Sequence, residues 1–206
     1  MKVIFALCFF FFAAAVSAQD LAPDAQVKKI ADEVIAIAKQ DKDIRAGDQN
    51  RINELVNARV LPYFDFSRMT ALAVGHNWRK ASAEQQKALT SEFRTLLVRT
   101  YSSALSTYRN QVIEFKPLRA AAEDTDVKVR SQIRQPGSPP ISIDYSMEKD
   151  PSGWKVYDVV VDGVSLVTNY RETFNTEIHN AGVDGLIKSL ARKNRSLVIQ
   201  ASLHPK

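Results

Sequence analysis

Residues 127–147 read VKVRSQIRQPGSPPISIDYSM, and this stretch decides the fold. Apolar or small side chains alternate with polar ones over residues 127–134 and again over residues 141–147. Alternation with a period of two is typical of an antiparallel sheet with one buried and one solvated face. Further strands are expected at residues 111–117 and 154–161, and the second of these, apolar on both sides near its end, favours a central position. We therefore predict a curved antiparallel sheet of about four strands.

Helices are predicted on both sides of this stretch. The clearest begins at Ser82, which forms a capping box with Gln85, and its apolar stripe continues at helical spacing to Tyr108. Shorter amphipathic segments cover residues 23–74, a helix capped by Ser165 follows the sheet, and a last one follows Gly182 and is expected to end near Arg195. The order of helices, strands and helices indicates an α+β fold in which a mostly helical layer covers one sheet face.

The first eighteen residues, MKVIFALCFFFFAAAVSA, have the pattern of a secretory signal peptide. One Lys precedes an apolar run of 14 residues, and small residues follow at the expected cleavage site. A membrane anchor is the alternative, but a spanning helix needs about 20 apolar residues. We expect residues 1–18 to be removed and residues 19–206 to form a single domain.

Removal of the signal peptide would leave 206 − 18 = 188 residues with a net charge of +5 − 1 = +4. Cys8, the only cysteine, would be lost with it. Disulfides, zinc–cysteine sites, iron–sulfur clusters and cysteine nucleophiles are therefore excluded from the mature chain. A thiol-free exported chain of this length must be held together by an ordinary apolar core.

Signals for catalysis are weak. His76, His179 and His204 form no metal-binding motif, so no metal site is expected. Ser165 has only half of a nucleophile elbow and is better explained as a helix cap. Asp158 and Asp162 are best read as turn and cap acceptors. A small hydrolase stays open as an alternative, and it would need His76 or His179 beside an acid or a nucleophile.

Basic residues gather in two places. Lys128, Arg130 and Arg134 share one strand face, which is either a solvated surface or a surface for anionic headgroups or an acidic partner. Lys188, Arg192, Lys193 and Arg195 are expected near a helix C-terminus, where the helix dipole favours them. Nucleic acid binding is not expected, because aromatic residues are not interleaved with the basic ones.

Three stretches together resemble a known family. Residues 60–66 (VLPYFDF) lead to residues 75–79 (GHNWR), residues 93–101 (FRTLLVRTY) lie in the long helix, and residues 159–167 (VVVDGVSLV) run into residues 169–174 (NYRETF). In this order and spacing they resemble the MlaC family, also called the toluene-tolerance auxiliary family, and the resemblance extends from about Ala25 to Leu190.

The resemblance implies a periplasmic phospholipid carrier that catalyses no reaction and needs no metal or cofactor. Such carriers move phospholipid between an outer-membrane lipoprotein complex and the MCE-domain protein of an inner-membrane ABC transporter, which maintains outer-membrane lipid asymmetry. The implied fold is a curved sheet on helices with a deep apolar cavity between them. A periplasmic protein-binding module or chaperone without lipid cargo is the alternative function, and the chain is expected to be a monomer.

On this resemblance, lipid contacts are expected from the long helix, the inward strand positions and the helix after the sheet. A closed core is the alternative role for the same apolar stripes. Tyr170 is expected at a cavity mouth, and Arg171 is expected either to bind a lipid phosphate or to pair with a carboxylate such as Asp162. The expected lipid-binding residues are Phe93, Leu97, Tyr101, Leu105, Val129, Ile143, Tyr145, Val160, Leu166, Val167, Tyr170, Arg171 and Phe174.

Overall fold

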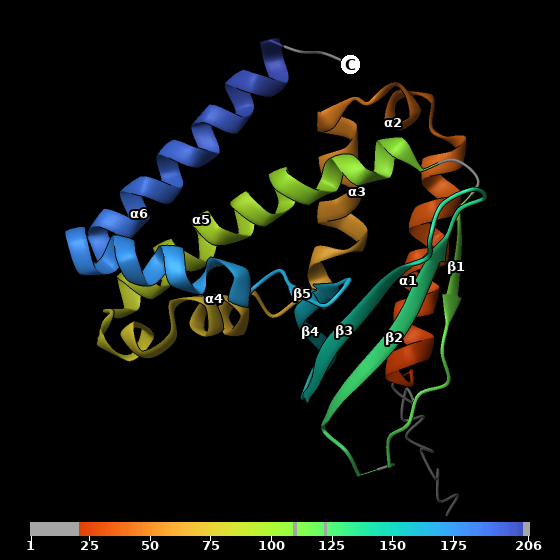
Figure 1. The fold of residues 1–206 in the computed structure, drawn as a ribbon, viewed down its shortest axis with the longest axis horizontal. Coiled ribbons are helices and arrows are strands. Elements are labelled where there is room, and N and C mark those ends of the chain that lie inside the picture. The colour runs from red at the N-terminus through yellow and green to blue at the C-terminus, as the bar shows by residue number, and fades with distance from the viewer. Residues whose placement is uncertain (1–20, 109–110, 122, 204–206) are drawn as a thin grey trace, which may run out of the picture.

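The computed structural model describes residues 21–108, 111–121 and 123–203, and the expected signal peptide lies outside these ranges. Helices come first, then strands, then helix, which confirms the predicted α+β fold (Figure 1). The α-helices are α1 (Pro23–Gln40), α2 (Lys42–Ala46), α3 (Gln49–Arg59), α4 (Phe66–Val74), α5 (Ala83–Tyr101) and α6 (Arg171–Leu203). The 3-10 segments are η1 (Leu61–Tyr63), η2 (Gly75–Lys80), η3 (Ser102–Thr107) and η4 (Thr168–Tyr170). No helix of the described ranges is long and apolar enough to cross a membrane.

The sheet has five strands in the described part of the chain, one more than expected. They are β1 (Val112–Phe115), β2 (Asp126–Arg134), β3 (Ile141–Asp150), β4 (Gly153–Val161) and β5 (Val164–Ser165). All neighbours are antiparallel and follow the order of the sequence. The additional strand, β5, has only two residues, too few to produce an alternating pattern in the sequence.

Strand β4 contains a bulge at its centre. Met147 of β3 faces Val156 of β4, but the preceding residue of β3, Ser146, faces Asp158, so Tyr157 is an extra residue without a cross-strand partner. An extra residue reverses the phase of the side chains that follow it. The inward side chains of β4 are therefore even-numbered before Tyr157 and odd-numbered after it.

A local sequence signal explains where α5 begins. The capping box of α5 is present: the Gln85 N–H donates to Ser82 Oγ at 3.2 Å, and the Ser82 N–H donates to Gln85 Oε1 at 3.0 Å. The α-helical part ends at Tyr101, and the rest of the predicted stripe forms η3. The long apolar stripe is thus divided between an α-helix and a tighter 3-10 segment.

The last helix is longer than the sequence suggested. Gly182 separates two helical segments of α6, as expected, because its backbone is not helical (φ 70° and ψ −178°) and forms a kink between them. Beyond the kink, α6 continues to Leu203, so the expected helix end near Arg195 and the expected tail are wrong. Leu197, past that expected end, packs on the buried residues of α5 and α6, which explains why the helix continues.

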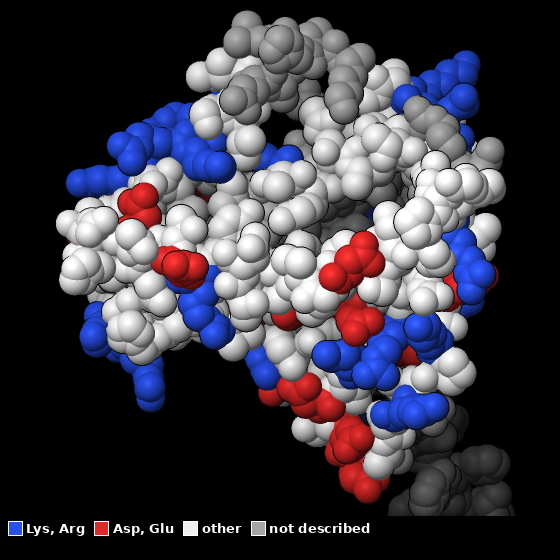
Figure 2. Space-filling view, viewed as in Figure 1, with Lys and Arg blue, Asp and Glu red and all other residues white. Residues whose placement is uncertain are grey.

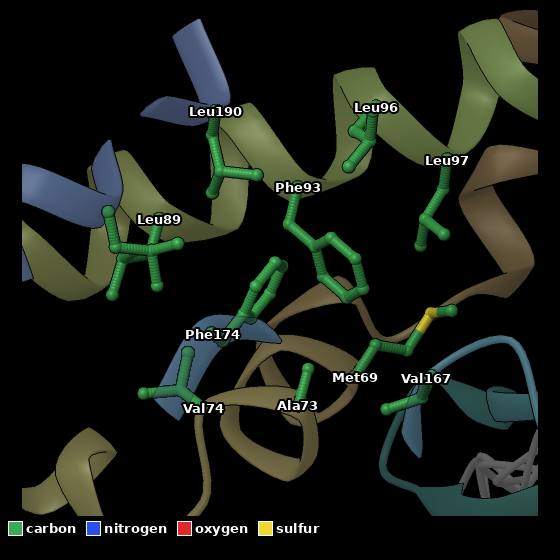
Figure 3. Packing of buried hydrophobic residues seen from close by; sticks show 11 residues of the cluster. Met69, Ala73, Val74, Leu89, Phe93, Leu96, Leu97, Val167, Phe174 and Leu190 are labelled. Carbon is green, nitrogen blue, oxygen red and sulfur yellow. The ribbon is translucent and has the colours of Figure 1, made fainter. Parts of the chain in front are cut away.

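The core of the described residues divides into three clusters. The helical cluster joins α4, α5 and α6 around Phe93 (Figure 3). The ring of Phe93 meets the rings of Phe174 and Tyr170 edge-on, with 5.2 Å between the centroids of each pair. The sheet cluster places Val129 and Met147 of the sheet against Val27 of α1. The amino-terminal cluster joins α1, α2 and α3, and its fully buried members include Ile44 and Ile52.

A side-chain clamp holds α4 to the sheet. Arg68 of α4 lies over the ring of Tyr157, with 3.7 Å between the guanidinium carbon and the ring centroid, and pairs with Glu148 and Asp126. The Tyr157 hydroxyl donates to Asp126 Oδ1 at 2.9 Å. Tyr157 follows the inward-facing Val156, so it lies on the outer face, and the bulge keeps the next residue, Asp158, paired with Ser146 of that same face.

Candidate functional site

An apolar cavity of about 220 Å³ lies where the three core clusters meet. Its walls come from α3, η1, α4, α5, η3, β4 and the turn after β5. Ser102, one of its few polar wall residues, donates its hydroxyl to Asn53 Oδ1 at 3.3 Å. The lining residues are Val56, Val60, Leu61, Phe64, Phe66, Met69, Leu97, Val98, Tyr101, Ser102, Leu105, Val159 and Leu166.

The structure brings some of the expected lipid-binding residues to this cavity and places others in closed core. Leu97, Tyr101, Leu105 and Leu166 line the cavity. The other apolar residues of the long helix and the following segment, Phe93, Val167, Tyr170 and Phe174, belong to or pack on the helical cluster. The strand residues Val129, Ile143 and Tyr145 belong to or pack on the sheet cluster.

Val160 lies on the face of the sheet opposite the cavity. Its cross-strand partner is Asp144, a residue of the outer face that pairs with Arg130. The inward neighbour is Val159, which faces Tyr145 and lines the cavity. The inward position is therefore Val159 and not Val160, because the bulge at Tyr157 shifts the alternation by one residue. A strict period-two pattern along the strand does not include such a shift.

Arg171 has a structural contact away from the cavity. Its Nε and Nη2 both donate to the carbonyl oxygen of Leu72, at 3.1 and 2.9 Å. Leu72 lies in the last turn of α4, where carbonyl groups lack helical partners. Arg171 therefore joins the start of α6 to the end of α4. Its acceptor is a backbone carbonyl, whereas the sequence predicted a lipid phosphate or a carboxylate.

Sequence reasoning missed the wall formed by residues 56–69. This segment crosses from α3 through η1 into α4, and it supplies Leu61, Phe64 and Phe66 to the cavity. Two bonds fix it to β4: the Asp65 N–H donates to the Val156 carbonyl at 2.9 Å, and Lys155 Nζ donates to the Pro62 carbonyl at 2.8 Å. The sequence did contain a signal for this wall. More apolar residues lie around Pro62 than the buried face of one short helix can accommodate.

The rings of Phe64 and Phe66 stack at 5.7 Å between centroids and separate the cavity from an outer groove. That groove has a volume of about 740 Å³ and includes Lys87, Arg94 and Asp150 in its walls. Because it is open and carries charges of both signs, it differs in chemistry from the apolar cavity behind the two rings.

Tyrosine side chains beside the cavity remain neutral. Burial, together with the nearby Tyr101, raises the pKa of Tyr170 to about 12. Burial also raises the pKa of Tyr145, a shift that a hydrogen bond with Ser131 partly opposes. The surroundings of both tyrosines therefore disfavour charge.

The residues considered for catalysis do not assemble into a site. His76 and His179 are exposed and absent from the cavity wall, and His204 lies outside the described residues. Ser165 donates to Asp158 Oδ2 at 2.7 Å and accepts the N–H of Thr168 at 2.9 Å, so its hydroxyl organises the turn before η4. Asp162 accepts the Ser142 N–H at 2.8 Å. No group of three or more potential metal ligands occurs within residues 21–108, 111–121 and 123–203.

Comparisons with known proteins agree with the geometry. A family model described as MlaC protein matches residues 28–192. The intermembrane phospholipid transport system binding protein MlaC of Haemophilus influenzae is 25% identical over 183 residues, which cover 87% of this chain and 86% of that protein. Toluene tolerance protein ttg2D of Pseudomonas putida is 24% identical over 153 residues, covering 74% of this chain and 71% of that protein.

A solved structure is similar over nearly its whole length. It is the phospholipid-binding protein from Ralstonia solanacearum in complex with a phospholipid, 41% identical, with a TM-score of 0.81. The match covers 86% of this chain and 99% of that one. Taken with the family model, which spans most of the described residues, these matches show that the chain belongs to the MlaC family.

Proposed function

We propose that this chain is a phospholipid carrier that holds acyl chains in the apolar cavity. The observation that supports this most directly is the cavity itself, which lies between the helices and the sheet and is lined almost wholly by carbon. A relative of the same fold, 41% identical, was solved with a phospholipid bound.

The energetics explain why a carrier is needed. Two acyl chains contain about 28 methylenes, and each is worth about 0.8 kcal/mol when removed from water, so roughly 20 kcal/mol opposes free transit of a phospholipid. A carrier must offer equivalent burial with few unsatisfied polar groups. The walls meet the second part of this requirement, because the hydroxyl of Ser102 already has a partner in Asn53.

Loading requires the cavity to widen. Its volume of about 220 Å³ is below the range of about 300–1,000 Å³ that is common for ligand pockets. The walls belong to three clusters, and they would move apart at the joint between them, where Phe64 packs on the helical and sheet clusters and Phe66 on the helical and amino-terminal clusters. Acyl chains would occupy that joint, and the headgroup would stay near the surface.

The proposed cellular role is the one that the resemblance to the MlaC family implies. We propose that residues 1–18 direct export and are removed, and that residues 19–206 act in the periplasm as a single domain. There the chain would shuttle phospholipid between an outer-membrane lipoprotein complex and the MCE-domain protein of an inner-membrane ABC transporter. It would act as a monomer, without catalysis and without a cofactor.

The test is extraction of the purified protein with organic solvent, followed by mass spectrometry. We expect one phospholipid per chain, absent from an unrelated exported protein purified in parallel. Protein that contains no phospholipid, and that takes up none from vesicles, would contradict the proposal. If such protein still captured periplasmic proteins in a salt-sensitive manner, the chaperone alternative would be favoured.

A further inference from the structure

The second half of α6 exposes a row of cations along one face. Lys188, Arg192 and Arg195 are spaced by four and three residues, so they lie on the same side of the helix, and all three are exposed. Leu186 and Leu190, which are 1% and 4% exposed, face the core on the other side. These three cations are called the basic row below. Figure 2 shows Lys and Arg side chains gathered over α6 at the upper left.

The helix dipole does not explain the basic row. Favourable interaction with a helix C-terminus is limited to about the last turn. Because α6 ends at Leu203, Arg195 lies about two turns before its end, and Lys188 lies farther still. The sequence-based explanation of this cluster therefore fails for the observed helix.

Carboxylates within the protein do not neutralise the row either. Among the described residues, no ion pair involves Lys188, Arg192 or Arg195. The carboxylate of Glu92, on the neighbouring helix α5, has a different partner: it accepts a hydrogen bond from Asn194 Nδ2 at 2.7 Å.

The basic face of the sheet is different. Arg130 lies 3.8 Å from Asp144, and Arg134 lies 2.7 Å from Glu114, each pair joining two strands. Of the two basic regions seen in the sequence, only the one on α6 lacks acidic partners within the described part of the chain.

We propose that the basic row docks the protein on the surface of an anionic phospholipid bilayer. The inference rests on the proposed function, because a lipid carrier must meet surfaces that hold lipid. Charge complementarity supports it, since cations on a helix attract anionic headgroups. The row also lacks the aromatic anchors common at the centres of protein interfaces. Ile199, which is 59% exposed, extends the row by one turn with an apolar side chain that suits the bilayer interface.

Docking through this face would place α6 between the membrane and α5, the helix that contributes to the cavity lining. Arg99 Nη1 of α5 donates to the carbonyl oxygen of Asn194 at 2.5 Å, which joins the two helices beside the row. The same part of α5 contributes Leu97 and Tyr101 to the cavity. A bilayer that binds the basic row would therefore be separated by one helix, α6, from the helix that lines the lipid site.

The test compares two triple variants of the full mature chain by co-sedimentation with vesicles. The row variant is Lys188→Gln, Arg192→Gln, Arg195→Gln, and Gln keeps a similar helix propensity. The control variant is Lys128→Gln, Arg130→Gln, Arg134→Gln, which removes the same charge from the sheet. Vesicles are either phosphatidylcholine alone or equal parts phosphatidylcholine and phosphatidylglycerol.

We expect the parent chain to bind the anionic vesicles and not the neutral ones. Each cation near an anionic surface is worth roughly fivefold in partitioning, so the row variant should bind about 100-fold more weakly. The control variant should bind nearly as well as the parent chain. Added salt should weaken the binding of the parent chain and of the control variant.

Equal losses in the two variants would show that only net charge matters and would overturn the inference. It would also be overturned if the parent did not bind anionic vesicles, as expected for a row that meets an acidic protein instead. Lipid extraction separates these failures from failure of the proposed function. A row variant that still contains phospholipid leaves the carrier proposal standing, whatever the vesicles show.

Discussion

Replacing Val159 by Thr and, separately, Val160 by Thr tests the cavity with two neighbouring residues of one strand. Thr has nearly the shape of Val and suits strands, so each change chiefly exchanges a methyl group for a hydroxyl. Val159 is 9% exposed and lines the cavity, whereas Val160 faces outward opposite Asp144. Lipid binding should therefore weaken only in the Val159 variant.

The size of the effect follows from the position of the hydroxyl. Before lipid binds, water can reach a hydroxyl on the cavity wall, but acyl chains would remove that water. Burying a hydroxyl without a partner costs about 1–3 kcal/mol, so at about 2 kcal/mol the lipid affinity should fall roughly 30-fold. In the Val160 variant the hydroxyl stays in contact with solvent, and the affinity should change by less than about twofold.

The assay is displacement of a fluorescent phospholipid from delipidated protein, with denaturant unfolding in parallel. Unfolding free energies should fall by about 1 kcal/mol or less in both variants, so a loss of affinity cannot be attributed to loss of the fold. Equal affinities for the two variants, or a larger loss at Val160, would refute the assignment of the cavity as the lipid site.

Three further predictions concern stability. Phe93→Ala removes a fully buried ring and should lower the unfolding free energy by about 3–5 kcal/mol in denaturant titrations; a loss below about 1 kcal/mol would contradict its central position. Gly182→Ala places a side chain at φ 70° and should cost about 1–3 kcal/mol in thermal unfolding, with no change if the kink is not as described. The pKa of Tyr170 is raised from 10.0 to about 12, so the folded state favours the neutral phenol; its contribution to stability is full below pH 10 and is lost as the pH rises towards 12. Tyr170→Phe should reduce this alkaline loss in a pH series of denaturation curves, and an unchanged series would count against the shift.

Much of the fold could be predicted because its signals are local. The capping box at Ser82 and Gln85 requires only four consecutive residues, and it is formed as expected. The alternation in β2 and β3 persists because their pairing is regular throughout. Where one residue pattern governs one element, sequence and structure agree.

The departures come from contacts between distant residues. The bulge at Tyr157 accompanies a clamp to Arg68 on α4, which no pattern within the strand reveals, and it moved the inward position from Val160 to Val159. The end of α6 was placed at its basic residues, but Leu197 packs on the core beyond them.

The same reason explains the partial prediction of the cavity. Its walls come from many segments: Phe64 lies in the short connection fixed to β4 through Asp65, and Phe66 is the first residue of α4. Leu97 and Phe93 belong to one helical stripe, yet only Leu97 reaches the cavity. The distance between packed elements decides which residue of an apolar stripe lines a cavity. The sequence of a single element does not determine that distance.

The division of the core into three clusters has a consequence for how this protein is purified and measured. If a phospholipid fills the joint between the clusters, its acyl chains complete the packing of an interior that the protein alone leaves partly empty. A ligand that binds only the folded state raises the free energy of unfolding by mass action, by about 2.7 kcal/mol at one hundred times its dissociation constant. The melting temperature of a sample would then depend on how much phospholipid is bound to the protein. Two preparations of identical sequence should melt apart when one has been delipidated and should converge once both have been reloaded.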